Sequence, residues 1–396
     1  MTIVAIPLIA FGAFVTAYVA YLTILFCANA AIREDGEFVP ARIRAINVLI
    51  PAHNEELYLP RLLSSLVEQR YPKDRFRVTV IADNCEDRTA AAARQFEVDV
   101  LERTDPHKRS KGYAIGWALE QIGLNRFDAL VIVDGDSTVS ADFLKQLNLQ
   151  LERGDNVIQC YNGLANPEQS WFTRLMDVSR TIANEIIHPG KRKLGLSSHL
   201  MGNGMCFSAA ALHTNAWRAF SIGEDWEHYA RLVLSGEYIG YSRLARVYHQ
   251  ESVNLQQASS QRLRWSSSRF QVLKQFGPAL LIEGIRTRSA RCLDASLPLL
   301  FPNPSLGINL TVAGFAGAVV YGLITGSAGL AVWFAVLTLA QFAMFMIGVL
   351  YTEHRLANAG SIFLAPLFLV WKMGIDLLSL FGRGTKQWKS TERRLL

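Results

Sequence analysis

The stretch Leu130-Val131-Ile132-Val133-Asp134-Gly135-Asp136-Ser137 decides the fold prediction. Its four apolar residues, mostly β-branched, predict a buried strand of a parallel sheet, and two carboxylates follow one residue apart. Ligands of open α/β sheets bind beyond the carboxyl ends of the strands, so these acids stand where a ligand is expected. Carboxylates at this spacing fit a divalent cation on a phosphate-bearing substrate. A strand that runs into a simple Asp/Gly turn is the alternative.

Strand-like and helix-like patterns alternate around this stretch, from about residue 45 to residue 161. Such alternation predicts a doubly wound α/β domain with right-handed crossovers. The expected strands are 46–50, 78–82, 98–101, 128–133 and 156–160, and the expected helices are 55–68, 88–95, 111–121 and 141–151.

Polar side chains follow three of the expected strands, namely His53-Asn54-Glu55, Asp83-Asn84 and Asp134-Gly135-Asp136. A fold that only needs turns could supply each group, but three groups on one sheet edge favour a ligand site. No G-x-G-x-x-G motif follows the first strand and no P-loop motif occurs, so a dinucleotide or Walker-type site is not expected.

Further candidates lie downstream. Residues 171–187 predict an amphipathic helix, and residues 188–193 predict a basic loop suited to a membrane surface. The glycines of Gly202-Asn203-Gly204-Met205 permit close backbone approach to a ligand, or simply a tight turn. The acids Glu224-Asp225 begin a helix that extends to about residue 234, where the helix macrodipole alone would favour them.

A helix is also expected over residues 255–276, and it carries Gln261-Arg262-Leu263-Arg264-Trp265. Gln261, Arg264 and Trp265 fall on one helical face. Cations and an indole there could bind a pyrophosphate and stack on a sugar ring. A surface helix with its arginines in solvent is the alternative.

Membrane-like segments flank this domain. The 396-residue chain is 50% hydrophobic and 19% charged, which indicates a protein that is partly soluble and partly membrane-embedded. Residues 3–31 carry no charge and are long enough to span a bilayer, and with no basic region before them they predict a retained anchor. Residues 308–324 and 330–351 are expected to span. The segment 361–381 contains Lys372 and Asp376 and is expected at the interface, in a helix bundle or across the membrane.

The cysteines and the net charge indicate the cellular compartment and the kind of partner. The five cysteines are scattered, so neither a disulfide framework nor a zinc site is expected, and a reducing cytosol fits best. A formal net charge of +6 is a modest basic excess that suits a membrane surface or a phosphorylated substrate better than nucleic acid.

The ordered motifs resemble those of membrane-bound family 2 glycosyltransferases, the relatives of cellulose, chitin, hyaluronan and poly-N-acetylglucosamine synthases. The resemblance runs over most of the chain and rests on the order and spacing of the whole set. The motifs are Pro-Ala-His-Asn-Glu (51–55), Ala-Asp-Asn-Cys-Glu-Asp (82–87), Lys-Gly-Tyr-Ala (111–114), Asp-Gly-Asp (134–136), Gly-Asn-Gly-Met (202–205), Glu-Asp (224–225) and Gln-Arg-x-Arg-Trp (261–265).

The resemblance implies a GT-A type nucleotide-sugar-binding domain inserted between an N-terminal transmembrane helix and C-terminal transmembrane or interfacial helices. The expected division is an anchor at 1–31, a cytoplasmic catalytic domain at 32–254, interfacial helices with the Gln-Arg-x-Arg-Trp motif at 255–305, a transmembrane region at 306–382 and a basic cytoplasmic tail at 383–396. The expected location is the inner or plasma membrane of a bacterium.

The resemblance also implies a donor site for a nucleotide-diphospho sugar, usually a UDP-sugar, with Mg²⁺ or Mn²⁺. By matching position, Glu55 and Asp83 would contact the uridine, and Lys111 would lie at the nucleotide end. Asp134 and Asp136 would hold the ribose and the metal-bound diphosphate, with Asp136 the favoured metal ligand.

The remaining motifs are assigned to catalysis and to the acceptor. Asp225 would be the general base, with Glu224 beside it on the acceptor side, and Trp265 would form the acceptor platform. One base without an enzymic nucleophile implies inversion at the anomeric carbon. The residues expected to clamp the diphosphate are Gln261, Arg262 and Arg264.

Three functions follow from this resemblance. The first is a synthase that extends a β-linked polysaccharide, with export or accessory subunits as further partners. The second is transfer of a single sugar to a membrane lipid such as a ceramide or hopanoid, and the third is a non-catalytic membrane scaffold. The tail from Lys386 to Arg393 resembles that of many such synthases, and we expect it to fold over the active site as a gate.

Overall fold

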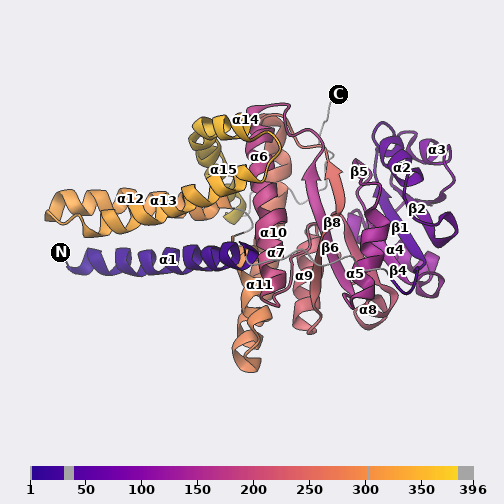
Figure 1. Ribbon diagram of the computed structural model, residues 1–396, viewed down its shortest axis with the longest axis horizontal. Coiled ribbons are helices and arrows are strands. Elements are labelled where there is room, and N and C mark those ends of the chain that lie inside the picture. The colour runs from indigo at the N-terminus through magenta and orange to yellow at the C-terminus, as the bar shows by residue number, and fades with distance from the viewer. Residues whose placement is uncertain (1, 31–39, 302–303, 382–396) are drawn as a thin grey trace.

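An eight-stranded mixed sheet organises the computed structural model, which describes residues 2–30, 40–301 and 304–381 (Figure 1). Its strand order is β3-β2-β1-β4-β7-β6-β8-β5. The strands are β1 (Ile46–Ala52), β2 (Phe76–Asp83), β3 (Asp99–Arg103), β4 (Ala129–Ile132), β5 (Ser137–Val139), β6 (Val157–Leu164), β7 (Met205–Ser208) and β8 (Ile239–His249).

The first half of the sheet confirms the doubly wound prediction. Strands β3, β2, β1 and β4 are neighbours and pair in parallel, with Ile46 in register with Phe76 on one side and Ala129 on the other. The carboxyl ends of β1, β2 and β4 therefore meet at one edge. The second half is mixed, because β7 pairs antiparallel with both β4 and β6. Strands β5 and β7, of three and four residues, are too short to show a period in the sequence, and β8 was also not predicted.

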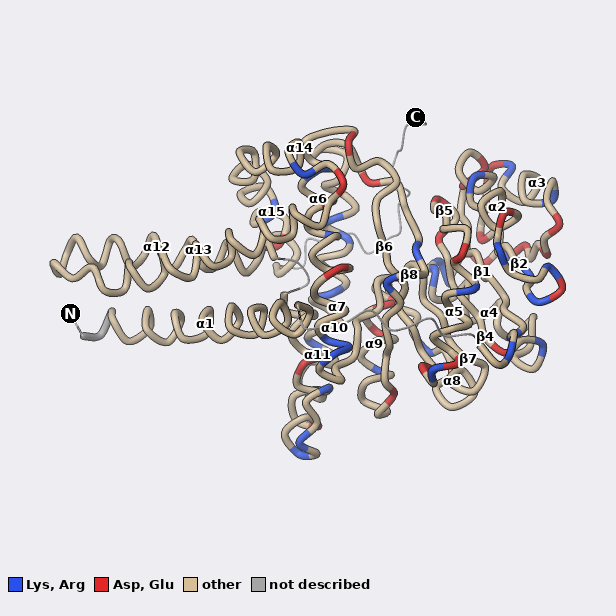
Figure 2. Tube along the Cα trace, viewed as in Figure 1, with Lys and Arg blue, Asp and Glu red and all other residues tan. Residues whose placement is uncertain are grey.

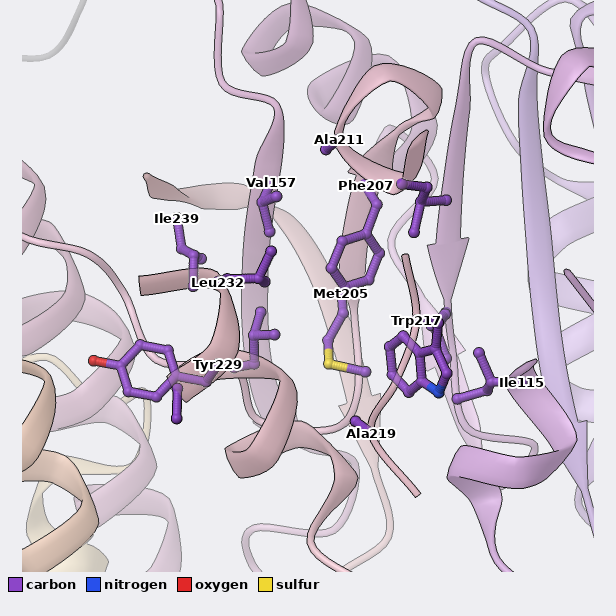
Figure 3. Packing of buried hydrophobic residues seen from close by; sticks show 14 of the residues in the cluster. Ile115, Val157, Met205, Phe207, Ala211, Trp217, Ala219, Tyr229, Leu232 and Ile239 are labelled. Atoms are coloured by element: carbon purple, nitrogen blue, oxygen red, sulfur yellow. The ribbon is translucent and has the colours of Figure 1, made fainter. Parts of the chain in front are cut away.

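Helices cover both faces of the sheet, and side chains alternate between two cores. Leu49 packs into the core under α4 and α9, whereas its neighbours Val48 and Ile50 pack into the core under α2 and α5. Figure 3 shows the first core, where Met205 and Phe207 of β7 meet Trp217. The helices are α2 (Leu59–Val67), α3 (Thr89–Ala93), α4 (Lys111–Ile122), α5 (Phe143–Glu152), α8 (Ala209–Thr214) and α9 (Glu224–Leu234), with short 3₁₀ turns at Lys73–Arg75 and Leu124–Arg126.

The predicted basic loop at 188–193 is wrong, because this segment is a helix and its first four residues are buried. Helix α6 (Trp171–Ile182) continues through a π-turn, η3 (Ala183–Ile187), into α7 (His188–Lys193). The Lys191 ammonium is neutralised by Asp294, with Nζ and Oδ2 2.7 Å apart, and can therefore be buried. A Cβ at Gly190 would lie 2.5 Å from the carbonyl oxygen of Leu25, so glycine lets α1 pack closely on α7.

The membrane-facing part consists of helices at both ends of the chain. The described residues contain four helices long and apolar enough to span a membrane, namely Ala5–Ala30, Pro304–Thr325, Gly329–Leu350 and Arg355–Leu380. Figure 2 shows that α1, α12 and α13, which lie side by side, carry no charged residue. The elements are α1 (Thr2–Ala30), α10 (Leu255–Thr287), α11 (Ala290–Leu300), α12 (Pro304–Thr325), α13 (Gly329–Leu350), α14 (Arg355–Gly360), η4 (Ser361–Leu364) and α15 (Ala365–Leu380).

The last of these segments buries its two charges in protein. Lys372 and Asp376 contact each other one turn apart on α15, and Ser266 of α10 donates a hydrogen bond of 2.8 Å to Asp376. Helix α15 packs on α10 and on α12, and α14 lies beside α6 (Figure 1). The segment thus joins the helix bundle, one of the arrangements expected from its sequence. By length and composition it also qualifies as a span.

Candidate active site

The three polar turns of the sequence come together at one sheet edge. Asn54 and Asn84 follow β1 and β2 with φ of 56° and 50°, a left-handed conformation that asparagine tolerates better than most residues. His53 Nδ1 lies 2.8 Å from the carbonyl oxygen of Asp83 and so joins the two turns. A Cβ at Gly135 would lie 3.5 Å from Cγ of Glu55, which places the turn after β4 against the turn after β1.

Asp83 is held in place by a buried arginine. Arg103, at the end of β3, has its Nη1 2.5 Å from Oδ1 of Asp83, and its Nη2 lies 3.2 Å from Asp105. Asn84 donates to the same Asp83 oxygen at 3.0 Å and accepts from the backbone N–H of Asp105 at 2.9 Å. The carboxylate is fixed before any ligand arrives. Arg103 could not be identified from the sequence, because a basic residue at the end of a short edge strand is common.

Lys111, the first residue of α4, connects the turn after β4 to the glycine loop and to α9. Its ammonium pairs with Asp134, donates to the carbonyl oxygen of Gly202 at 2.5 Å and lies 3.8 Å from Oε1 of Glu224. Burial lowers the pKa of Lys111, but the two carboxylates outweigh it and the net shift is upward. Asn203 completes the loop by accepting from the backbone N–H of Asp134 at 3.1 Å.

Asp134 and Asp136 fit a divalent cation that also binds phosphate. Both side chains line the same cavity beyond the end of β4, and carboxylate oxygens are the ligands that Mg²⁺ and Mn²⁺ favour. The described residues contain no group of three or more metal-ligating side chains. An ion held here would therefore take its remaining ligands from a nucleotide and from water.

Two acids begin α9, of which Glu224 is buried and Asp225 is half-buried. Burial raises the pKa of Glu224 to about 7 and that of Asp225 to about 6, so both carboxyls titrate near neutrality. The backbone N–H of Trp226 donates to Oδ1 of Asp225 at 2.8 Å, and Oδ2 faces Gly202, where a Cβ would lie only 3.2 Å away. Asp225 thus has one oxygen anchored and the other beside the glycine loop, as a positioned general base requires.

The Gln-Arg-x-Arg-Trp motif lies on α10 and faces the same space. Asn254 caps this helix by accepting from the backbone N–H of Gln257 at 2.9 Å. Arg262 also lines the cavity, and its Nη2 lies 2.5 Å from the buried carboxylate of Glu251 while its guanidinium stands 4.7 Å from the centre of the Trp265 ring. The buried side chain of Gln261 and the half-buried Trp265 both line the cavity, together with Arg264.

One cavity of about 1030 Å³ contains every candidate residue and extends into the helix bundle. Its sheet end is lined by the carboxylates after β1, β2 and β4, and its middle by α9 and α10. Its far end is lined by apolar residues of the membrane helices, among them Ile308 and Val312 of α12, Phe342 and Phe345 of α13, and Leu369 of α15.

Several lining residues were not expected from the sequence. Arg180 and Ser179 come from α6, His199 and Met201 from the segment before the glycine loop, and Arg269 from α10, two turns beyond Arg262. They carry no motif, and only packing of helices distant in sequence brings them to the cavity. The tail expected to gate the site, Lys386 to Arg393, lies outside the described residues.

A mixed α/β sheet with acids at the ends of its parallel strands and two further acids at the start of a later helix suits a transferase that acts on a phosphate-bearing donor. The sequence model described as "Glycosyltransferase like family 2" matches residues 43–268, more than half of the chain. The chain therefore belongs to glycosyltransferase family 2 and is an enzyme of that family.

Curated relatives agree over the same region. A probable glycosyltransferase, YdaM, of Bacillus subtilis is 25% identical over 240 residues, which is 58% of this chain and 56% of the relative. The β-monoglucosyldiacylglycerol synthase of Trichormus variabilis is 24% identical over 252 residues, 61% of this chain and 53% of the relative. The 4,4'-diaponeurosporenoate glycosyltransferase of Staphylococcus aureus is 32% identical over 127 residues, 30% of this chain and 32% of the relative. The chain thus spans about half the length of the first two relatives and a third of the last.

A solved structure supports the fold. The mannosyltransferase PcManGT from Pyrobaculum calidifontis, in complex with GDP-Man and Mn²⁺, superposes with a TM-score of 0.57 at 16% identity and covers 93% of this chain and 99% of its own. The fold is accordingly a GT-A-like α/β domain flanked by long apolar helices at both ends, as the resemblance implied.

Proposed function

We propose that the chain transfers one sugar from a nucleotide-diphospho sugar to a hydroxyl group of a membrane lipid, with inversion at the anomeric carbon. The main support is that one cavity is lined both by Asp225 and by apolar residues of α12, α13 and α15. A lipid whose chains lie between these helices could present its headgroup to the base without leaving the membrane.

The lining of the membrane end favours a lipid over a growing glycan. A glycan path needs groups that hydrogen bond to successive hydroxyls, but Ile308, Val312 and Phe342 offer only hydrocarbon. Three polar residues there are already hydrogen bonded, because Gln341 donates to Thr311 at 2.6 Å and Thr338 donates to the carbonyl oxygen of Phe334 at 2.9 Å. The names of two relatives also specify a diacylglycerol-type and a carotenoid-type acceptor.

The chemistry follows from the positions of the side chains. Asp225 Oδ2 would take the proton of the acceptor hydroxyl, whose oxygen forms the new bond to the anomeric carbon as the bond to the diphosphate oxygen breaks. The negative charge that develops on the leaving diphosphate would be stabilised by Arg264, with Gln261 beside it. A divalent cation held by Asp136 and Asp134 would add Lewis-acid stabilisation of the same charge.

The donor end is proposed to bind the nucleotide. Glu55 and Asp83 line the cavity where the base and ribose of a UDP-sugar would lie, and Lys111 orders the loop next to them. We propose that Arg262 holds Glu251 and the Trp265 ring in place. Of the two arginines, only Arg264 would then face the diphosphate.

Extension of a β-linked polysaccharide is the second candidate. It is favoured by Trp265, whose half-buried ring lines the cavity and could form a platform for a sugar acceptor, with Glu224 nearby on α9. In either case we propose a catalytic domain on the cytoplasmic side of a bacterial membrane. The arginines Arg42 and Arg44 after the first helix and the five unpaired cysteines are consistent with that side.

A product assay tests the proposal. The purified chain in lipid nanodiscs is given a panel of nucleotide sugars with Mg²⁺ or Mn²⁺, and the products are separated by thin-layer chromatography and by gel. A glycolipid carrying one sugar is the expected product. A high-polymer product would instead support the second candidate, and a lack of turnover with every donor and lipid would contradict both.

A further inference from the structure

The cavity contains a cation that no carboxylate neutralises. Arg180 of α6 lines the cavity, and within the described residues its only polar contact is the Met201 sulfur, 4.0 Å from Nη1. Burial and the nearby charge of Arg262 lower the pKa of Arg180 to about 10, with only Glu251 opposing. A guanidinium in such a place is satisfied when an anion with oxygen acceptors arrives.

Four other lysines and arginines that line the cavity are paired with carboxylates, and Arg109, Arg264 and Arg269 line it as well. Lys111 pairs with Asp134, Lys191 with Asp294, Arg262 with Glu251 and Lys372 with Asp376. Arg269 is buried and only distantly paired. It is only 3% exposed, its Nε and Nη2 make no hydrogen bond, and its nearest carboxylate oxygen is 4.0 Å away on Asp376, which already contacts Lys372.

Arg180 stands between the catalytic base and the membrane helices. On one side, Met201 precedes Gly202, which lies against Oδ2 of Asp225. On the other, Val178 and Ile182 of the same helix pack on Val349 at the end of α13. The same cavity is thus lined by Asp225, by Arg180 and by the apolar residues of α12 and α13.

We propose that Arg180 binds a phosphate in the headgroup of the acceptor lipid, so that the acceptor is an anionic phospholipid with a free hydroxyl, such as a phosphatidylglycerol. In such a lipid the hydroxyl would reach the base, the phosphate would meet Arg180 and the acyl chains would lie in the apolar space. A neutral acceptor such as diacylglycerol has no group for Arg180. This inference rests on the proposed lipid-directed transfer and specifies its substrate class.

Binding is measured first, without a donor sugar. The full chain is placed in phosphatidylcholine nanodiscs to which dioleoylphosphatidylglycerol or dioleoylglycerol is added, and lipid binding is followed by the shift in Tm. Phosphatidylglycerol should raise Tm, and Arg180→Gln should weaken its apparent affinity about 10–100-fold, the value of a charge-assisted hydrogen-bond pair. Arg180→Lys should recover part of it, because it keeps the charge but not the planar fork.

The controls separate binding from folding and from the donor. Arg174→Gln changes an arginine of the same helix that does not line the cavity and should behave as the wild type. Without added lipid, Arg180→Gln should not lower Tm, since no carboxylate loses a partner. A large fall would make Arg180 a structural residue and overturn the proposal, as would weaker binding of UDP and Mg²⁺ by this variant, which would assign Arg180 to the donor.

Turnover measurements then separate the proposed phosphate site at Arg180 from the proposed transfer to a lipid. With an active donor, phosphatidylglycerol should be glycosylated by the wild type and much less by Arg180→Gln. Glycosylation of dioleoylglycerol alone, equal in both proteins, would overturn the phosphate site and leave lipid transfer standing. Failure of every lipid as an acceptor would instead contradict the proposed function.

Discussion

The two ends of the cavity balance their charges in opposite ways. At the sheet end two of the carboxylates are already paired with cations of the protein. Asp83 pairs with Arg103, and Asp134 pairs with Lys111. Toward the membrane helices, the only polar group that Arg180 contacts among the described residues is a thioether. The sheet end is therefore organised before the donor binds, whereas the membrane end needs a charge that a substrate would bring. Changes at the two ends should consequently produce different defects.

Asp225→Asn lies between the two ends and should give the largest effect. Removing the base that accepts the hydroxyl proton should lower kcat about 10²–10⁴-fold, while donor binding at the sheet end stays intact. Turnover and UDP affinity would be measured on the same preparation. Asp142→Asn, which changes an exposed carboxylate paired with Arg70, is the matched control. Loss of UDP binding in Asp225→Asn would show that the base is misassigned.

Lys191→Met should cause the largest loss of stability. Lys191 and Asp294 are 1% and 4% exposed, and Tyr21 of α1 donates to the same carboxylate at 2.8 Å. The substitution leaves the Asp294 charge buried without its cation, which is expected to cost about 3–5 kcal/mol. A marked fall of Tm in detergent would confirm it. Replacing both partners, in Lys191→Met with Asp294→Leu, should recover part of the loss, and a double variant worse than the single one would contradict this account.

Lys111→Met should alter the rate and its pH dependence together. Because Asp225 must be ionised and burial raises its pKa to about 6, kcat/KM of the wild type should rise about tenfold per pH unit below pH 6 and level off above it. Lys111 is one of the charges that lower that pKa, so its removal should move this limb to higher pH. The lost contacts to Asp134 and Gly202 should also reduce kcat/KM about 10–100-fold.

The matched control for this experiment is Lys108→Met, an exposed lysine on the loop before α4 whose side chain does not line the cavity. Its pH profile should coincide with that of the wild type. If Lys111→Met shifted the acidic limb to lower pH, or left it unmoved, the proposed influence of Lys111 on Asp225 would be wrong.

The sheet end could be predicted from the sequence because its signals are local. The apolar run before Asp134 and Asp136 predicts a buried strand, and the two acids mark its polar end. The same pattern occurs at β1 and β2. Parallel pairing then gathers the three turns without further information. The roles proposed for these residues came from the family resemblance. The contact between Lys111 and the carbonyl oxygen of Gly202 is compatible with those roles.

The membrane end could not be predicted because its signals are long-range. Arg180 lies 21 residues before Met201, and Lys191 lies 103 residues before Asp294. A basic run at 188–193 is typical of a surface loop. The carboxylate that neutralises Lys191 is Asp294 on α11, which the local sequence does not reveal. For the same reason the ion pair of Arg262 with Glu251 could not be expected from the motif that contains Arg262.

The smallest effect is expected for Arg94→Ala, at the sheet end but outside the cavity. Arg94, which follows the last residue of α3, pairs with Glu102 of β3, and the two side chains are 55% and 58% exposed. Water screens such a pair and ordering two long side chains opposes it, so its loss should change stability by about 0–1 kcal/mol. Tm and UDP affinity should match those of the wild type within error. A loss approaching that of Lys191→Met would mean that the outer helix α3 is coupled to the donor turns, and the distinction between buried and exposed pairs drawn for the two ends would fail.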